Sequence, residues 1–293
     1  MSDTGNAAGR IAVSRIIHTI HATTDIHGCR LLYQDALGGL VFAENYFPPE
    51  DRDCALLYVT DHMVEPMAPC HPEDMTKPYA RMAAKIGQAF HSFEIKVEDG
   101  PAASQAIRDA GLKTSSDYGV FFFVRPEQTG GVLLEVCAVP NPNDPYDRPN
   151  WNPAVGAGHH AGVLQLDHIA CVVPDVAKAL TFFTGVLDGE VLSDEGTALP
   201  QPGRRVLTRI GDTRVAFIQP DDTQAGPLGA FLGKAQNGVY ALVWRIEDED
   251  RARRHFTGEQ LGMRLTQAGC VSSGFAIDPQ DFFGARHEFV VSG

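Results

Sequence analysis

The sequence lacks the long apolar runs that cross membranes. A spanning helix needs about 20 consecutive apolar residues, and no segment of this chain reaches that length. The first ten residues, MSDTGNAAGR, also lack the apolar centre of a signal peptide. The sequence therefore predicts a cytoplasmic protein that does not act at a membrane.

Basic residues are scarce relative to acidic ones. The chain has 24 Lys and Arg residues against 37 Asp and Glu residues, which gives a formal net charge of −13. Phosphate backbones and anionic lipid surfaces repel such a protein. The composition argues against nucleic acid as a partner and favours a small molecule.

Paired cysteines are missing too. The six cysteines are scattered without a C-x-x-C pair, and most have apolar neighbours. Buried free thiols are therefore predicted in preference to a zinc cluster or a disulfide framework. The rest of the composition is that of a globular protein, because 293 residues with 44% hydrophobic content can bury one large core or two smaller ones.

What the sequence does contain is one supersecondary pattern that occurs four times. The first copy has a strand at 15–23, a helix after the N-cap Asp25, and strands near 40–47, 53–60 and 62–67. Copies with the same order begin near Phe90, Leu166 and Val239. The predicted fold class is therefore α+β, built from four βαβββ modules.

A stretch rich in proline and asparagine separates the second copy from the third. This stretch, 139–162, is predicted to lack regular structure and to act as a linker. It divides the chain into a first domain at 11–138 and a second domain at 163–293. Each predicted domain then holds two modules.

The third copy carries the sharpest motif, His168 to Asp175 (HIACVVPD), followed by a helix and a glycine. Two further segments, GGVLLE ending at Glu135 and GPLGAFLGK starting at Gly226, complete the pattern. The chain resembles the vicinal oxygen chelate superfamily, also called the glyoxalase/bleomycin-resistance/dioxygenase fold. Its motifs look closest to methylmalonyl-CoA epimerase and glyoxalase I. The resemblance implies two glyoxalase-like domains, in which paired modules curl a sheet around one divalent metal.

The resemblance implies metal ligands in the first domain, on the first and last strands of its modules. The residues at these places are His18, Glu65, His91 and Glu135. Imidazole and carboxylate together suit Zn, Co, Ni, Mn or Fe and leave positions open for substrate oxygens. Glu135 also needs a positive partner on physical grounds, because it lies in an apolar strand. His21 is the alternative to His18; the spacing to the following Asp favours His18.

The second domain departs from the pattern. It keeps His168 and Glu288, but Tyr240 and Ala216 stand where the first domain has a histidine and a glutamate. Tyrosine is a poor ligand at neutral pH, since its ordinary pKa is about 10. We expect a degenerate, metal-free copy, with a His-Tyr-Glu site as the alternative.

The resemblance implies a divalent-metal-dependent isomerase, epimerase or lyase that acts on an enolisable carbonyl compound through a metal-chelated enolate. Glu50 resembles the acid that moves the proton in epimerase-like relatives, and Glu135 is a second candidate for this role. One alternative is an Fe(II) extradiol-type dioxygenase that cleaves an aromatic ring; another is a non-catalytic binding protein. A homodimer is compatible with all three. The aromatic residues expected to line the pocket are Phe42, Phe93, Phe121, Phe123 and Trp244.

Overall fold

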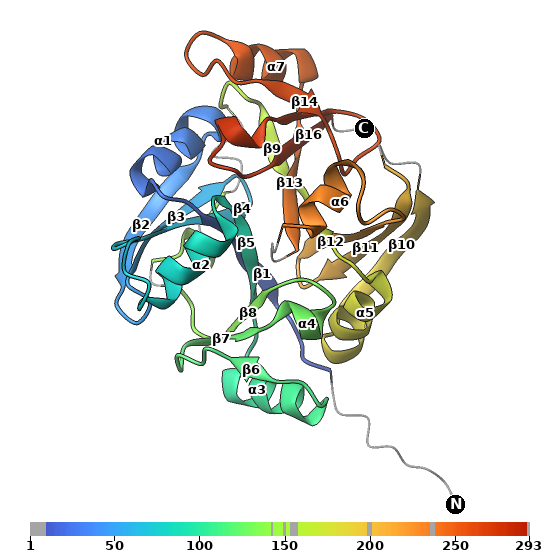
Figure 1. The fold of residues 1–293 in the computed structure, drawn as a ribbon. Helices are drawn as coiled ribbons and strands as arrows, with labels where there is room; N and C mark the ends of the chain where they lie inside the picture. Colours follow the sequence, from blue (N-terminus) through green and yellow to red (C-terminus); the bar gives the residue numbers. More distant parts are fainter. Residues whose placement is uncertain are drawn as a thin grey trace, which may run out of the picture.

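The computed structural model describes residues 10–141, 143–148, 151–152, 158–197, 201–234 and 238–291. Its strands form two mixed sheets of eight strands each (Figure 1). The first sheet contains β1 (Arg15–Ala22), β2 (Leu40–Phe47), β3 (Arg52–Val59), β4 (His62–Pro69), β5 (Ala89–Lys96), β6 (Thr114–Ser115), β7 (Phe121–Val124) and β8 (Leu134–Cys137). The second contains β9 (Val163–Val172), β10 (Glu190–Thr197), β11 (Gly203–Ile210), β12 (Thr213–Pro220), β13 (Val239–Ile246), β14 (Leu265–Gln267), β15 (Phe275–Ile277) and β16 (His287–Val291).

The strand order is the same in both sheets. It runs β2-β3-β4-β1-β5-β8-β7-β6 in the first sheet and β10-β11-β12-β9-β13-β16-β15-β14 in the second. Within the first sheet β1 pairs in parallel with β4, β5 pairs in parallel with β8, and the two modules meet where β1 and β5 run antiparallel. The predicted α+β class with four paired βαβββ modules is confirmed.

Helices connect and cover the strands. They are α1 (Ile26–Leu37), α2 (Pro78–Ile86), α3 (Gly100–Asp109), α4 (Pro126–Thr129), α5 (Val176–Leu180), which continues as the π-helical segment η3 (Thr181–Val186), α6 (Gly226–Leu232) and α7 (Glu249–Thr257), with single 3-10 turns at η1 (Pro145–Asp147) and η4 (Pro279–Asp281). Among the residues that the structure describes, no helix is both long enough and apolar enough to cross a membrane.

The first helix of every module begins in the same way. Asp25, Asp99, Asp175 and Asp248 each precede a helix and accept a hydrogen bond from the backbone N–H three residues later. A carboxylate at this position satisfies one of the N–H groups that the first helical turn leaves unpaired. The repeated N-cap explains why the module boundaries are readable in the sequence.

One hydrophobic core runs through both halves of the molecule. Phe93 of β5 and Phe183 of η3 belong to it, with ring centroids 6.0 Å apart. Trp244 of β13 is fully buried in the same core. The prediction that Phe93 and Trp244 line a pocket is therefore wrong. Both residues point away from the concave faces of the sheets.

The predicted linker is more ordered than its composition suggests. Asp144 is buried and accepts hydrogen bonds from Arg15 at 2.6 Å and from the Tyr58 hydroxyl at 2.9 Å, and η1 follows it. This part of the segment therefore packs on the first sheet. Residues 142, 149–150 and 153–157 of the linker, like 1–9 at the start of the chain, lie outside the described residues. The residue limits of the two domains stay a prediction.

Candidate functional site

The centre of the first sheet holds a group of buried acidic side chains around one imidazole. His18 of β1 lies opposite Glu94 of β5, and Glu94 lies beside Glu135 of β8. One ligand atom from each of these three side chains lies within 4.8 Å of the other two. All three residues are buried.

Glu65 joins this group from β4. Nε2 of His18 lies 2.9 Å from Oε2 of Glu65, and Nδ1 lies 3.8 Å from Oε1 of Glu94. Both contacts are ion pairs when His18 is protonated, and neither has the geometry of a hydrogen bond. Within the described part of the chain, both ring nitrogens of His18 and Oε2 of Glu135 are buried without a hydrogen-bond partner. Such atoms are rare in folded proteins.

A divalent cation fits this donor set. One imidazole and several carboxylates are ligands that Zn, Mn, Co, Ni and Fe accept. A cation would also supply a partner to Oε2 of Glu135 and to one of the two ring nitrogens of His18. We call the set of His18, Glu65, Glu94 and Glu135 the acidic cluster.

The charges of the acidic cluster are strongly coupled. Burial opposes a charged His18, but the attraction of Glu65 and Glu135 outweighs it and raises the pKa of His18. Burial also opposes a charged Glu65, yet His18 and Arg52 lower its pKa to about 2. Burial, with repulsion from Glu65, raises the pKa of Glu94 to about 8. Burial and the neighbouring Glu94 raise the pKa of Glu135 well above its usual range. Full ionisation of the three carboxylates therefore requires a further positive charge.

His91 stands apart from the acidic cluster. The pairing of β1 with β5 shifts between Ile20 and His21, so that His91 is an extra residue in a bulge. Its Nδ1 lies 2.9 Å from Oγ of Ser92, and its ring lines a neighbouring cavity. Burial lowers its pKa to about 4, with Arg52 adding to the effect. The position facing His18 belongs to Glu94, and a ligand role for His91 stays a prediction.

His21 lies on the opposite side of β1. Its Nε2 donates to the backbone oxygen of Phe283 at 2.9 Å, and its Nδ1 accepts from the Tyr33 hydroxyl at 3.0 Å. Nδ1 of His21 therefore has a partner in Tyr33, and Nε2 has one in the second half of the molecule. The ring does not reach the acidic cluster.

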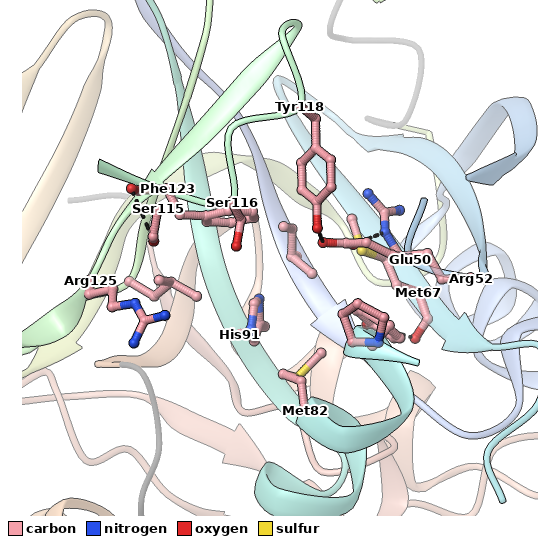
Figure 2. A pocket seen from close by; sticks show the side chains of 14 residues that line it. Glu50, Arg52, Met67, Met82, His91, Ser115, Ser116, Tyr118, Phe123 and Arg125 are labelled. Atoms are coloured by element: carbon pink, nitrogen blue, oxygen red, sulfur yellow. Dashed lines mark hydrogen bonds and ion pairs between the residues drawn. The ribbon is translucent and has the colours of Figure 1, made fainter. Parts of the chain in front are cut away.

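A cavity of about 270 Å³ lies beside the acidic cluster. Figure 2 shows Arg125 on one side of it, Glu50, Arg52 and Tyr118 on the other, and His91 between them. Helix α2 contributes Met82 and its neighbours to the wall. The cavity therefore combines charged groups on two sides with apolar surface between them.

Arg52 connects the cavity with the acidic cluster. Its Nε donates to Oε2 of Glu50 at 2.7 Å, and its Nη1 lies 3.6 Å from Oε1 of Glu65. The Tyr118 hydroxyl donates to the other oxygen of Glu50 at 2.8 Å. Burial and this hydrogen bond raise the pKa of Tyr118 to about 12. Only 12% of the Glu50 side chain is exposed, so this residue is a fixed part of the cavity wall.

Sequence reasoning missed Glu94 and Arg52. Glu94 carries the same signal as Glu135, because it is a lone acid in an apolar strand whose ionised form needs a positive partner. Arg52 gives no comparable signal, since it stands in a polar turn segment, and only the fold brings it to Glu65.

The comparison with known families decides the identity of the fold. Residues 165–289 match the family model described as Glyoxalase/Bleomycin resistance protein/Dioxygenase superfamily. The second half of this chain therefore resembles a domain of that superfamily. The resemblance inferred from the motifs is thereby confirmed, and the first half repeats the same strand order. Enzymes of this superfamily use divalent metals.

Two curated relatives match part of the chain. Mitochondrial methylmalonyl-CoA epimerase from Bos taurus is 34% identical over 84 residues, which are 28% of this chain and 46% of that protein. The same enzyme from Homo sapiens is 32% identical over 75 residues, which are 25% of this chain and 41% of that protein. The chain thus spans less than half the length of the curated relatives that it matches.

Two solved structures share the architecture of the whole chain. A triple mutant of 4-hydroxymandelate synthase from Streptomyces coelicolor has a TM-score of 0.68 at 17% identity, covering 96% of this chain and 93% of its own. The 2,3-dioxygenase LapB from Pseudomonas sp. KL28 has a TM-score of 0.58 at 15% identity, covering 97% and 94%. At these identities the likeness shows the two-domain fold alone.

Proposed function

We propose that this protein is a divalent-metal-dependent isomerase, epimerase or lyase that acts on an enolisable carbonyl compound. The observation that supports this proposal is the acidic cluster beside a cavity whose wall contains a fixed carboxylate, Glu50. A cation held by His18, Glu65, Glu94 and Glu135 would supply Lewis acidity toward a carbonyl oxygen.

Glu50 is suited to move a proton in this cavity. Arg52 and Tyr118 hold its two oxygens in place, and the carboxylate still lines the cavity. A general base needs this combination of fixed position and access to the substrate. Glu50 would remove the proton next to the carbonyl group, and its return to the same carbon or the loss of a neighbouring group would complete an epimerisation or an elimination.

The opposite wall favours an anionic substrate. Arg125, Ser115 and Ser116 line it and offer one positive charge and two hydroxyl groups. A guanidinium group recognises a carboxylate with paired hydrogen bonds. Met67 and Met82 provide flexible apolar surface between the two walls. We infer a small carbonyl acid as the substrate, bound with its acid group at Arg125 and its reacting carbon toward Glu50.

A ring-cleaving dioxygenase is the second candidate, because His91 lines the cavity as a further imidazole. Non-haem iron oxygenases bind their metal with two histidines and one carboxylate. The acidic cluster instead offers one histidine and three carboxylates. The isomerase or lyase is therefore the proposal that the donor set favours.

Metal analysis of the purified protein with two variants tests the proposal. We expect one bound divalent ion per chain in the wild type, at least a tenfold loss of metal affinity in Glu135→Gln, and no change in Glu127→Gln, an exposed acid eight residues earlier. Proton exchange with D₂O next to the carbonyl of small 2-oxo acids should require both the metal and Glu50. A metal content in Glu135→Gln equal to that of the wild type would show that the metal is not bound at the acidic cluster. Iron with oxygen uptake and a yellow product from catechols would assign the dioxygenase.

A further inference from the structure

The second sheet contains the same concave surface with a different set of side chains. His168 of β9 lies opposite Val243 of β13, as His18 lies opposite Glu94. Ala216 of β12 holds the place that Glu65 holds in β4, since each pairs with the residue two positions after the histidine. Two of the three carboxylates of the acidic cluster are thus replaced by apolar residues.

The third carboxylate, Glu288, is fully engaged by the protein itself. One of its oxygens accepts hydrogen bonds from the backbone N–H of Gly269 at 2.7 Å and from Nε of Arg286 at 2.6 Å. The other oxygen accepts from the backbone N–H of Cys270 at 2.9 Å. The negative charge of Glu288 is therefore compensated by Arg286, and its oxygens have little capacity left to bind a cation.

Arg205 brings a positive charge to this surface. It pairs with Ile218 of β12 as Cys54 pairs with Met67 of β4, so an arginine replaces a cysteine at the same register. Its side chain is 13% exposed, and its Nε is buried without a partner among the described residues. Its Nη1 lies 3.8 Å from Glu195, whose side chain is 60% exposed. A contact of this length to an exposed carboxylate compensates the charge of Arg205 only weakly.

His168 presents a buried hydrogen-bond acceptor to the same surface. Its Nδ1 donates to Asp167 at 2.7 Å, and Asp167 also accepts from Arg214 at 2.9 Å and from Arg245 at 2.5 Å. This arrangement assigns the proton of the ring to Nδ1 and leaves Nε2 as an acceptor. Within the described part of the chain, Nε2 is buried and has no partner.

Arg205 and His168 both line one cavity, together with the acidic residues Asp167 and Glu195. Its volume is about 320 Å³, and Ser272 and Ser273 also line it. We propose that this cavity binds a small hydroxycarboxylate, whose carboxylate pairs with Arg205 and whose hydroxyl group donates to Nε2 of His168. Each group of such a ligand satisfies one protein atom that is otherwise buried without a partner, and a metal is not needed. This site is independent of the acidic cluster and of the function proposed for it.

Calorimetric titration of the full chain tests this site with matched pairs of acids. Glycolate, lactate and malate carry the hydroxyl group, whereas acetate, propionate and succinate lack it. In buffer with EDTA, we expect at least one hydroxy acid to bind with saturation and about tenfold more tightly than its matched acid, because the latter leaves Nε2 of His168 unpaired. Saturable binding of no hydroxy acid, or equal binding of both members of each pair, would overturn the proposal.

Variants locate the binding. Arg205→Gln should weaken the binding of the hydroxy acid at least tenfold. The control is Arg204→Gln, on the same strand as Arg205, which removes an exposed charge paired with Asp194 and should leave the binding unchanged. Glu135→Gln should also leave it unchanged, which separates this site from the acidic cluster. If Arg205→Gln does not fold, Arg205→Lys keeps the charge but loses the unpaired Nε, and should bind several-fold more weakly than the wild type. Wild-type affinity in a folded Arg205 variant would show that the acid binds elsewhere.

Discussion

The two sheets of this protein have one backbone plan and opposite site chemistry. At the centre of the first sheet, carboxylates surround His18; at the centre of the second, Arg205 and a neutral imidazole line the cavity. The strand order and the register are the same, so the difference lies in a few side chains. The fold fixes where side chains meet, and their identity sets the sign of the charge that they attract.

The difference also has an energetic side. The second sheet satisfies its buried acid, because Glu288 accepts three hydrogen bonds from the protein. The first sheet leaves Oε2 of Glu135 and both nitrogens of His18 without a hydrogen bond among the described residues, although Nε2 of His18 lies 2.9 Å from Glu65. Buried charges without partners destabilise the folded state. A cation bound at the acidic cluster, as proposed above, would therefore stabilise the first sheet, whereas Glu288 of the second sheet already has its partners in the protein.

The largest expected effect comes from making the first sheet resemble the second. Glu94→Val installs the residue that stands opposite His168 and removes one of the carboxylates that meet at His18. We expect a loss of metal affinity of about a hundredfold or more, measured by titration with Zn²⁺ or Mn²⁺. The matched control is Glu98→Val, which removes an exposed acid just after the same strand. Undiminished affinity in Glu94→Val would show that Glu94 is not a ligand.

The next effect is the stabilisation of the protein by a metal. A ligand that binds only the folded state at a concentration of a hundred times its Kd adds about 2.7 kcal/mol to the free energy of unfolding. We expect a gain of this size from the divalent ion in the wild type and in Arg205→Gln, measured by urea unfolding. Glu135→Gln should show little gain. The same gain in Glu135→Gln as in the wild type would place the ion outside the acidic cluster.

The repeats and the helix starts of this fold were readable from the sequence because their causes are local. Each module begins its first helix with an aspartate N-cap. His18, Glu65 and Glu135 meet because they occupy the inward-facing positions of neighbouring strands. Their convergence follows from the paired modules.

The residues that the sequence placed wrongly or missed are those whose neighbours depend on how the strands pair, residue by residue. The pairing of β1 with β5 places Glu94, three residues after His91, opposite His18, and His91 itself is the unpaired residue of a bulge that nothing in the local sequence marks. The expectation for Phe93 was wrong because adjacent strand residues face opposite sides, so the neighbour of an inward Glu94 must face the core. Arg52 contacts Glu65, and Arg205 contacts Glu195, each on a neighbouring strand. These contacts can be predicted only when the pairing register of the strands is known.

Folding should shift the pKa values of the two equivalent histidines, His18 and His168, in opposite directions. In metal-free protein, the attraction of Glu65 outweighs burial and raises the pKa of His18, whereas burial lowers the pKa of His168 despite Asp167. His18 therefore contributes stability below its unfolded pKa of about 6.5 and loses this contribution as the pH rises through its folded pKa. His168 reduces stability as the pH falls below about 6.5, because the unfolded chain then binds a proton that the folded ring does not.

NMR of the imidazole carbons measures the pKa of both rings directly. In the presence of EDTA, the pKa of His18 should lie above the ordinary value of about 6.5 and that of His168 below it. A tenfold change in a ring's proton affinity on folding corresponds to about 1.4 kcal/mol. His18→Gln and His168→Gln assign the signals. A His168 signal that titrates above that of His18 would reverse the contrast drawn between the two sheets.

The smallest expected effect concerns what the two sheets share. Asp25 and Asp175 cap equivalent helices with the same hydrogen bond, 2.9 Å from Oδ1 to the backbone N–H three residues later. Asp25→Ala and Asp175→Ala should therefore each lower the free energy of unfolding by about 1 kcal/mol, measured by urea unfolding. Neither variant should change metal affinity or the binding of hydroxy acids. A much larger loss for one cap than for the other would mean that the two halves are not equivalent scaffolds, and the charge contrast could then no longer be assigned to the site residues alone.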